Sequence, residues 1–327
     1  MKPFKAVILF IIVLTLLLLL AESNHVYSIL GIKNKKVPIH DLDGYFYNDL
    51  VDLKRLTKPK IFIHLPLERN ERNWENFGSR TSTNMNMSIA YLNIKSVIRH
   101  CGHYYDVILM DNQNMYDVLE MYNLHDDFSD SKFDELDNYQ KKKWENYCKS
   151  MILQEFGGAM MEPYFYFVKC PDKSILQPRK LTITKYTNEG LFNSNKTSIA
   201  LPYNFMACSR KDKDLDIHLD YLYHSYKNMH RFQIEKYENS MLNYEKLNLI
   251  DPRLFGIQDK DGEQIYYTDL LSSQKNIHFA ANMVAIYVNV EMFKTESKNS
   301  WFLRLSPEQL MNSNNVIGRH IKYYEEN

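Results

Sequence analysis

The residues best suited to chemistry lie where apolar segments end. Glu162 follows the apolar run Ala159–Met161, and a glycine pair, Gly157 and Gly158, separates that run from a helical pattern. Gly157 suits the left-handed position that ends a helix, and Gly158 allows the backbone to pass close to a neighbour. The order helix, glycine pair, strand therefore places a carboxylate at the end of a predicted strand.

A second polar pair, Asp111 and Asn112, follows the predicted strand Tyr105–Met110. Ligands of parallel α/β sheets collect beyond the carboxyl ends of the strands, which favours contact with the ribose or base of a nucleotide. A cap for a helix over Met115–Tyr122 explains the pair equally well. Both interpretations stay open at this stage.

The helix before the glycine pair is expected to be amphipathic. Six residues recur at three-and-four spacing and predict one buried face: Trp144, Tyr147, Cys148, Met151, Ile152 and Phe156. Asn146, Lys149 and Leu153 fall on the other side, which we expect to face solvent. The helix is therefore expected to bury one face and expose the other.

Residues 146–163 resemble the signature of the DxD-containing glycosyltransferases, the group of outer-chain mannosyltransferases and capsular-polysaccharide sugar transferases. In that group a helix of pattern SDxxRYxxLxxYGG runs into a strand of pattern IYxDxD. Asn146 falls where the group has Asp, Lys149 falls where it has Arg, and the glycine pair aligns. Glu162 falls on the first Asp of DxD, whereas Tyr164 occupies the second position.

The resemblance implies a GT-A fold and transfer of a sugar from a nucleotide-sugar donor to a glycan or protein acceptor, with retention of the anomeric configuration. It implies donor-binding roles for Asn146, Lys149, Gly157 and Gly158, with Lys149 pointing toward the donor phosphates. It also implies a divalent cation, manganese or magnesium, held by Glu162. No catalytic residue is assigned.

Two other functions stay open. Because Tyr164 replaces the second carboxylate, the chain is alternatively a glycosyltransferase-like protein that has lost catalysis and acts as a binding or assembly module. A lumenal structural protein unrelated to sugar transfer is the third interpretation, and it requires the match at the glycine pair to be chance.

The elements that position these residues predict an α/β protein. A strand over Ile61–Leu65, a helix over Ser88–Arg99 and the strand ending at Met110 form a strand, helix, strand unit, which winds a parallel sheet. Further predicted elements are strands at 181–184, 197–201 and 284–288, a long helix at 215–229, and a capped helix start at Ser306. We therefore expect a GT-A-like, Rossmann-type and mostly parallel sheet flanked by helices.

The amino terminus carries an apolar segment. Residues 6–21 are apolar except for Thr15 and follow Lys2 and Lys5, which predicts a transmembrane signal anchor with the tail 1–5 in the cytosol. A cleaved signal peptide is the alternative, which the poor cleavage pattern disfavours. The expected protein is single-pass type II, attached to the membrane by this helix and facing the lumen of the endoplasmic reticulum or Golgi.

Residues 22–58 are interpreted as a stem and residues 59–327 as one GT-A-like domain, since 327 residues with 45% hydrophobic content suffice for a large core. Asn86 and Asn195 lie in sequons for N-linked glycans, which are used only if this domain is lumenal.

Composition argues against several function classes. Lys plus Arg and Asp plus Glu number 40 each, so no net charge attracts nucleic acid and we expect no nucleic-acid partner. The four cysteines form no CxxC pair, which argues against zinc ribbons and thioredoxin-like redox chemistry. The sequence contains no nucleophile elbow, P-loop or GxGxxG pattern.

Overall fold

The computed structural model of the chain describes residues 42, 44–47, 52–65, 88–124, 138–184, 204–228, 247–289, 293 and 297–326. The predicted anchor at 6–21, the sequons at Asn86 and Asn195, and the predicted strand at 197–201 lie outside these residues. Among the described residues, no helix has the length and apolar character needed to cross a membrane. The chain divides into two units, Met1–Gly44 and Tyr45–Asn327, and the second contains the elements described below.

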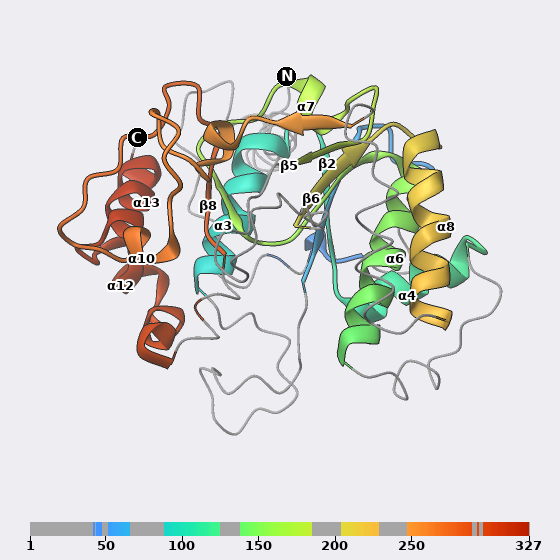
Figure 1. The fold of residues 1–327 in the computed structure, drawn as a ribbon, viewed down its shortest axis with the longest axis horizontal. Coiled ribbons are helices and arrows are strands. Elements are labelled where there is room, and N and C mark those ends of the chain that lie inside the picture. The colour runs from blue at the N-terminus through green and yellow to red at the C-terminus, as the bar shows by residue number, and fades with distance from the viewer. Residues whose placement is uncertain are drawn as a thin grey trace, which may run out of the picture. The chain divides into compact units, whose positions relative to one another are not determined.

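Strands and helices alternate through much of this unit (Figure 1). Their bounds are β1 Lys60–His64, α3 Ser88–Cys101, β2 Asp106–Met110, α4 Asn112–Met121, α6 Asn138–Phe156, β3 Gly158–Met161, β4 Phe165–Phe167, α7 Lys173–Leu176, β5 Thr182–Thr184, β6 Phe205–Cys208, α8 Lys213–Asn228, β7 Asn248–Ile250, η2 Pro252–Phe255, α10 Tyr267–Leu270, β8 Ala285–Tyr287, η3 Ser297–Arg304, α12 Pro307–Met311 and α13 Val316–Glu326.

A six-stranded sheet has the order β2-β1-β3-β6-β5-β7, and β4 and β8 form a separate antiparallel pair. β1 pairs in parallel with β2 and β3, and β5 pairs in parallel with β7. β6 is antiparallel to both of its neighbours, so it runs against the other five strands. The predicted α/β class with a mostly parallel sheet is confirmed.

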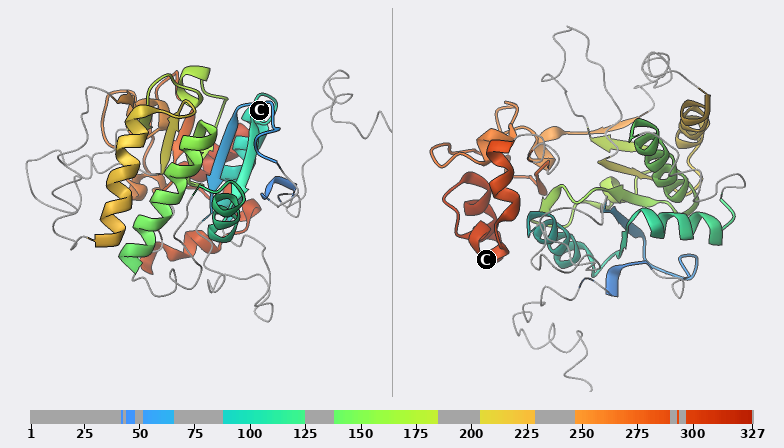
Figure 2. Two further views of the ribbon diagram at one scale, coloured as in Figure 1. Left: turned by 90° about the vertical axis from the view of Figure 1, so that its right-hand side faces the viewer. Right: turned by 90° about the horizontal axis from the view of Figure 1, so that it is seen from below.

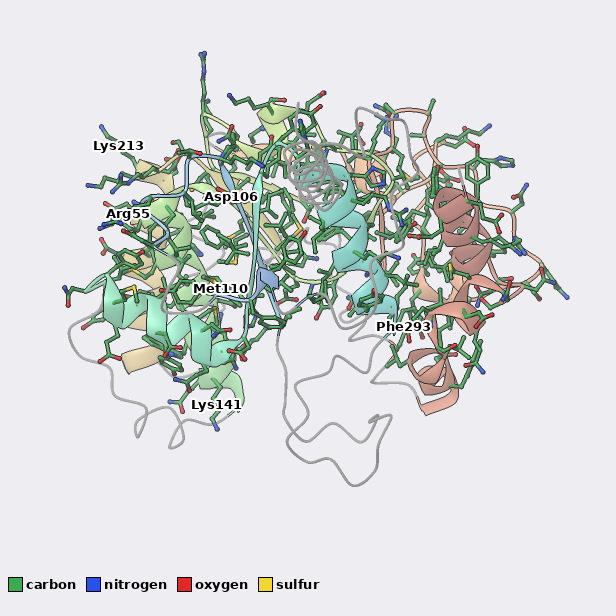
Figure 3. All side chains as sticks on the ribbon, turned by 180° about the vertical axis from the view of Figure 1, so that it is seen from behind. Arg55, Asp106, Met110, Lys141, Lys213 and Phe293 are labelled. Carbon is green, nitrogen blue, oxygen red and sulfur yellow. The ribbon has the colours of Figure 1, made fainter. Side chains whose placement is uncertain are left out.

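The strand order reverses next to β1. β2 lies on one side of β1, and β3, which follows β2 in the chain, lies on the other. The carboxyl ends of strands at such a reversal are where open α/β sheets bind ligands. Figure 3 labels Asp106 and Met110, the first and last residues of β2, and so shows the direction of the parallel strands.

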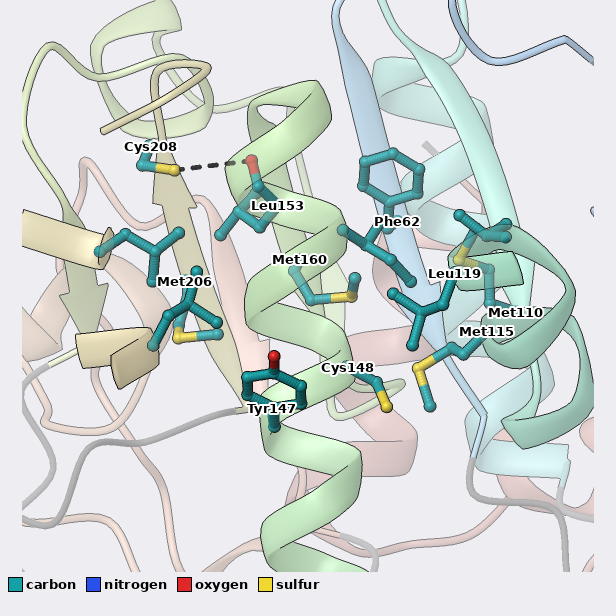
Figure 4. Packing of buried hydrophobic residues seen from close by; sticks show 14 of the residues in the cluster. Phe62, Met110, Met115, Leu119, Tyr147, Cys148, Leu153, Met160, Met206 and Cys208 are labelled. Carbon is teal, nitrogen blue, oxygen red and sulfur yellow. Dashed lines mark hydrogen bonds between the residues drawn. The ribbon is translucent and has the colours of Figure 1, made fainter. Parts of the chain in front are cut away.

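The helices α4, α6 and α8 pack together on one face of the sheet (Figures 1 and 2). Figure 4 shows the apolar layer between them and the strands, to which Phe62, Met160 and Met206 contribute from the sheet. Side chains of adjacent strand residues point to opposite faces, and Phe205 accordingly lies away from this layer. Its ring packs against Phe165 and Phe255, with centroids 6.0 and 5.0 Å away.

The predicted exposed side of α6 is wrong. Asn146, Lys149 and Leu153 have exposed fractions of only 5%, 0% and 0%. The helix lies over the sheet and packs against α4 and α8, so its two sides both meet protein. The polar residues Asn146 and Lys149 suggested a solvent-exposed face in the sequence. In the fold, both side chains are buried.

Most other predicted elements within the described residues agree with the structure to within a few residues. Ser306 caps α12 through a capping box with Gln309, as expected. α4 begins at Asn112, earlier than predicted, because the Asp111 carboxylate accepts the backbone N–H of Asn114 at 2.8 Å. In the segment interpreted as a stem, Phe46 forms a β-bridge with Leu109.

The last helix, α13, is fastened to α3 and β4 by a single carboxylate. Glu325 accepts hydrogen bonds from the guanidinium of Arg99 and, at 3.1 Å, from the hydroxyl of Tyr166. The ammonium of Lys95 lies 3.8 Å from the same side chain. Residues far apart in the chain therefore share one polar contact.

Gly158 should be intolerant of any side chain. It has φ +99°, and a Cβ there would overlap the carbonyl oxygen of Lys60 on β1. Gly262 is a matched control because its φ is +89° but nothing lies within 4 Å of its Cβ position. In chemical denaturation, Gly262→Ala should lower the free energy of unfolding by about 1 kcal/mol and Gly158→Ala by at least about 3 kcal/mol. Equal losses would contradict this close approach of β3 to β1.

Candidate functional site

Strand register brings His64 and Glu162 side by side. Phe62 of β1 pairs with Met160 of β3, and side chains two residues apart on a strand point to the same face. The next pair on that face is His64 and Glu162, at the carboxyl ends of the two strands. Phe62 and Met160 belong to the apolar layer beneath α6, so His64 and Glu162 also face α6.

Two lysine ammonium groups of α6 contact the carboxylate of Glu162. Lys142, Glu145, Asn146 and Lys149 are spaced three and four residues apart and form one stripe of the helix. The Nζ of Lys149 donates to the Oε1 of Glu162 at 2.7 Å. The Nζ of Lys142 donates to the same oxygen at 3.2 Å and lies 3.5 Å from the Oε2 of Glu145.

A chain of hydrogen bonds connects this stripe to His64. The Nδ2 of Asn112 donates to the Oε1 of Glu145 at 3.1 Å, which leaves its Oδ1 as an acceptor. That Oδ1 lies 2.7 Å from the Nε2 of His64, so Nε2 carries the proton. We call the seven residues the edge cluster: His64, Asn112, Lys142, Glu145, Asn146, Lys149 and Glu162.

Burial and charge set the protonation states of the edge cluster. Burial alone would raise the pKa of Glu162, but the ammonium groups of Lys149 and Lys142 bring its pKa well below the usual value. Burial lowers the pKa of Lys149, which the Glu162 carboxylate opposes. Burial, reinforced by the charge of Lys149, holds the pKa of His64 well below its usual value, so His64 is neutral at pH 7.

Two buried acceptors of the edge cluster lack donors among the residues that the structure describes. Neutral His64 with its proton on Nε2 presents a lone pair at Nδ1, and this atom has no hydrogen-bond partner within the described part of the chain. The Oδ1 of Asn146 is in the same situation. Buried polar atoms are normally paired, and an unpaired one costs about 1–3 kcal/mol. Both atoms suit a ligand that brings O–H or N–H donors.

The residues at Glu162 do not fit a divalent cation. Its Oε1 already accepts two ammonium groups, which repel a metal ion. Tyr164, at the second carboxylate position of the motif, is buried with its ring against Tyr287. No group of three or more His, Cys, Asp or Glu side chains that suits a metal ion occurs in the residues that the structure describes. Lysine ammonium groups take the place that the resemblance gives to the cation.

Some of the predicted site residues lie together in the edge cluster, and others lie outside it. Asn146, Lys149, Glu162 and Asn112 belong to the edge cluster, whereas the Asp111 carboxylate caps α4. The glycine pair allows a backbone conformation and a close packing that a side chain would prevent. Gly157 has φ +67°, and a Cβ there would lie 2.7 Å from the backbone nitrogen of Arg210.

Sequence reasoning missed three members of the edge cluster. His64 lies in the predicted strand Ile61–Leu65 and has no predicted site role, although its spacing of two residues from Phe62 marks the same face. Lys142 and Glu145 precede Lys149 by seven and four residues, which is the spacing of one helical stripe. Both signals were present in the sequence.

No family model matches this chain, and no curated protein sequence matches it. The function proposed below therefore depends on the edge cluster and on the resemblance of residues 146–163 described above.

Removing the ammonium of Lys149 should destabilise the fold strongly. Lys149→Met leaves a buried carboxylate without its nearest partner and should lower the free energy of unfolding by about 3–5 kcal/mol. Lys142→Met is the control, because half of its side chain is exposed, and should cost less than about 1 kcal/mol.

The double variant Lys149→Met/Glu162→Gln removes both charges and should recover much of the loss. Urea denaturation of the four proteins provides the comparison. Equal stability of the two lysine variants would show that the ion pair is not buried.

Proposed function

We propose that the chain is a glycosyltransferase-like protein of the GT-A type, which binds a nucleotide-sugar donor at the edge cluster and transfers the sugar to a glycan or protein acceptor. The observation that carries the proposal is the position of the helix, glycine pair and strand motif. Its strand is β3, and its carboxylate, Glu162, stands beside His64 where the strand order reverses. A motif that resembles a donor-binding signature thus ends where this class of sheet binds ligands.

The donor diphosphate is proposed to be held without a divalent cation. Lys142 is the ammonium of the edge cluster that solvent reaches, since half of its side chain is exposed. A flexible ammonium neutralises phosphate as a point charge. Lys142 can exchange its exposed contact with Glu145 for a donor phosphate while Lys149 keeps Glu162 neutralised.

The sugar or ribose hydroxyls are proposed to fill the two unpaired acceptors. Hydroxyl groups donate hydrogen bonds, whereas an ionised diphosphate only accepts them. The lone pair at Nδ1 of His64 and the Oδ1 of Asn146 therefore favour the polyhydroxyl part of a donor over its phosphates.

A non-catalytic binding module is the second candidate, and the charge balance of the edge cluster favours it. Two ammonium groups face two carboxylates, so these groups neutralise one another. The pKa of Glu162 is held well below its usual value, which makes this carboxylate a poor general base. In this case the edge cluster binds a nucleotide sugar and leaves it intact.

Calorimetric titration of the full chain with uridine and guanosine diphosphate sugars tests the first proposal. At least one should bind, with an affinity that differs by less than about twofold between buffers containing manganese and EDTA. Lys142→Ala should weaken binding about tenfold, equivalent to about 1.4 kcal/mol, while the neighbouring Lys141→Ala should not.

Failure of every donor to bind in either buffer would overturn the proposal, and a strict need for manganese would overturn its cation-free form. Release of free nucleoside diphosphate in the presence of acceptor glycans separates the two candidates. Binding without such release supports the non-catalytic module.

Asn146→Leu should separate binding from stability. Removal of an unpaired buried acceptor should leave the free energy of unfolding unchanged or raise it by up to about 1 kcal/mol, while donor affinity falls. Gln177→Leu is the control, since the Oε1 of Gln177 is also unpaired in the described residues, but Gln177 directly follows α7 and does not belong to the edge cluster. Equal donor affinity in the wild type and Asn146→Leu would exclude Asn146 from the site.

A further inference from the structure

α3 and β4 lie side by side and run in the same direction. The Nδ2 of Asn93 donates to the carbonyl oxygen of Pro163 at 2.8 Å. Further along both segments, the backbone N–H of Phe167 donates to the Oγ of Ser96 at 2.7 Å. Residue numbers increase together in these two contacts, so the carboxyl ends of α3 and β4 lie at the same end.

Two cysteines occupy that end. Cys101 is the last residue of α3, and Cys170 stands three residues after β4. The two thiols are neighbours, and each shifts the pKa of the other. Cys101 is buried and Cys170 is partly exposed, so Cys170 is the more accessible residue of the pair.

We propose that Cys101 and Cys170 are an oxidation site, which forms a disulfide on exchange with a small-molecule disulfide. The contacts at Asn93 and Ser96 hold the two segments in register, with Cys101 and Cys170 at the same end. The disulfide would link the segment that follows Glu162 in the chain, which includes β4, to the carboxyl end of α3. This inference is independent of the proposed function.

The exchange follows from the roles of the two thiols. The interaction between the neighbouring thiols raises the pKa of Cys101, to which burial adds, and lowers the pKa of Cys170. The Cys170 thiolate attacks one sulfur of the small-molecule disulfide, breaks its S–S bond and releases one thiolate.

Cys101 then loses its proton to solvent and attacks the Cys170 sulfur, which breaks the mixed disulfide and releases the second small thiol. The two protein thiols are oxidised, and one external disulfide is reduced to two thiols.

The other two cysteines serve as internal controls. Cys148 and Cys208 are buried in the apolar layer beneath α6 (Figure 4), and burial raises the pKa of both thiols. The Sγ of Cys208 is directed to the carbonyl oxygen of Leu153 at 3.8 Å. A buried thiol of raised pKa reacts slowly, so both should stay reduced.

Peptide mass spectrometry of the full chain tests the proposal. After incubation with oxidised glutathione, unfolding and alkylation, we expect a cross-linked peptide that joins Cys101 to Cys170, with Cys148 and Cys208 alkylated. Alkylation of all four cysteines, or any other pairing, would overturn the assignment. This measurement uses the wild-type chain and does not depend on the folding of a variant.

Variants test the order of the two steps. Cys101→Ser should stop the reaction at the mixed disulfide and leave one glutathione on Cys170, whereas Cys148→Ser should form the cross-link as the wild type does. The closed loop spans about 70 residues, and the oxidised wild type should melt roughly 5 °C above the reduced protein. Cys170→Ser should melt at one temperature in both conditions, and a shift equal to that of the wild type would contradict the proposal.

Discussion

The contact between Lys149 and Glu162 is the constraint on which the edge cluster depends. A carboxylate under a helix, at the end of a central strand, is strongly unfavourable unless an opposite charge reaches it. Lys149 reaches it at 2.7 Å, and this fixes the rotation of α6 about its axis. The same rotation directs Lys142, Glu145 and Asn146 toward the carboxyl edge of the sheet and leaves Trp144 and Cys148 for the apolar layer.

An ammonium group and a metal ion neutralise a carboxylate in different ways. A metal ion brings open coordination positions, which a ligand can occupy, and it can leave. The ammonium of Lys149 is covalently part of α6, is fully buried, and contributes no coordination position. The donor proposed for this edge would therefore be recognised by hydrogen bonds and by the more exposed Lys142.

Sequence patterns within short windows predict much of the fold but only part of the edge cluster. The glycine pair, the strand at Ile61–Leu65 and the helix at Ser88–Arg99 follow from turn chemistry and periodicity within short windows. The burial of Lys149 does not, because it depends on strand register and on a carboxylate thirteen residues later. The role of Asp111 stayed ambiguous for a similar reason, since a helix cap and a ligand contact require the same residue type at the same strand end.

The contact of Glu325 with Arg99 has a consequence for the order of folding. The two residues are 226 positions apart in the chain, and Tyr166 is 159 positions from the same carboxylate. Contacts of such long sequence separation carry a large loop-closure entropy and slow the rate-limiting step of folding. During synthesis, α3 and β4 emerge from the ribosome long before α13 does. Until α13 is synthesised, Arg99 lacks this partner, so this contact can form only late in the synthesis of the chain.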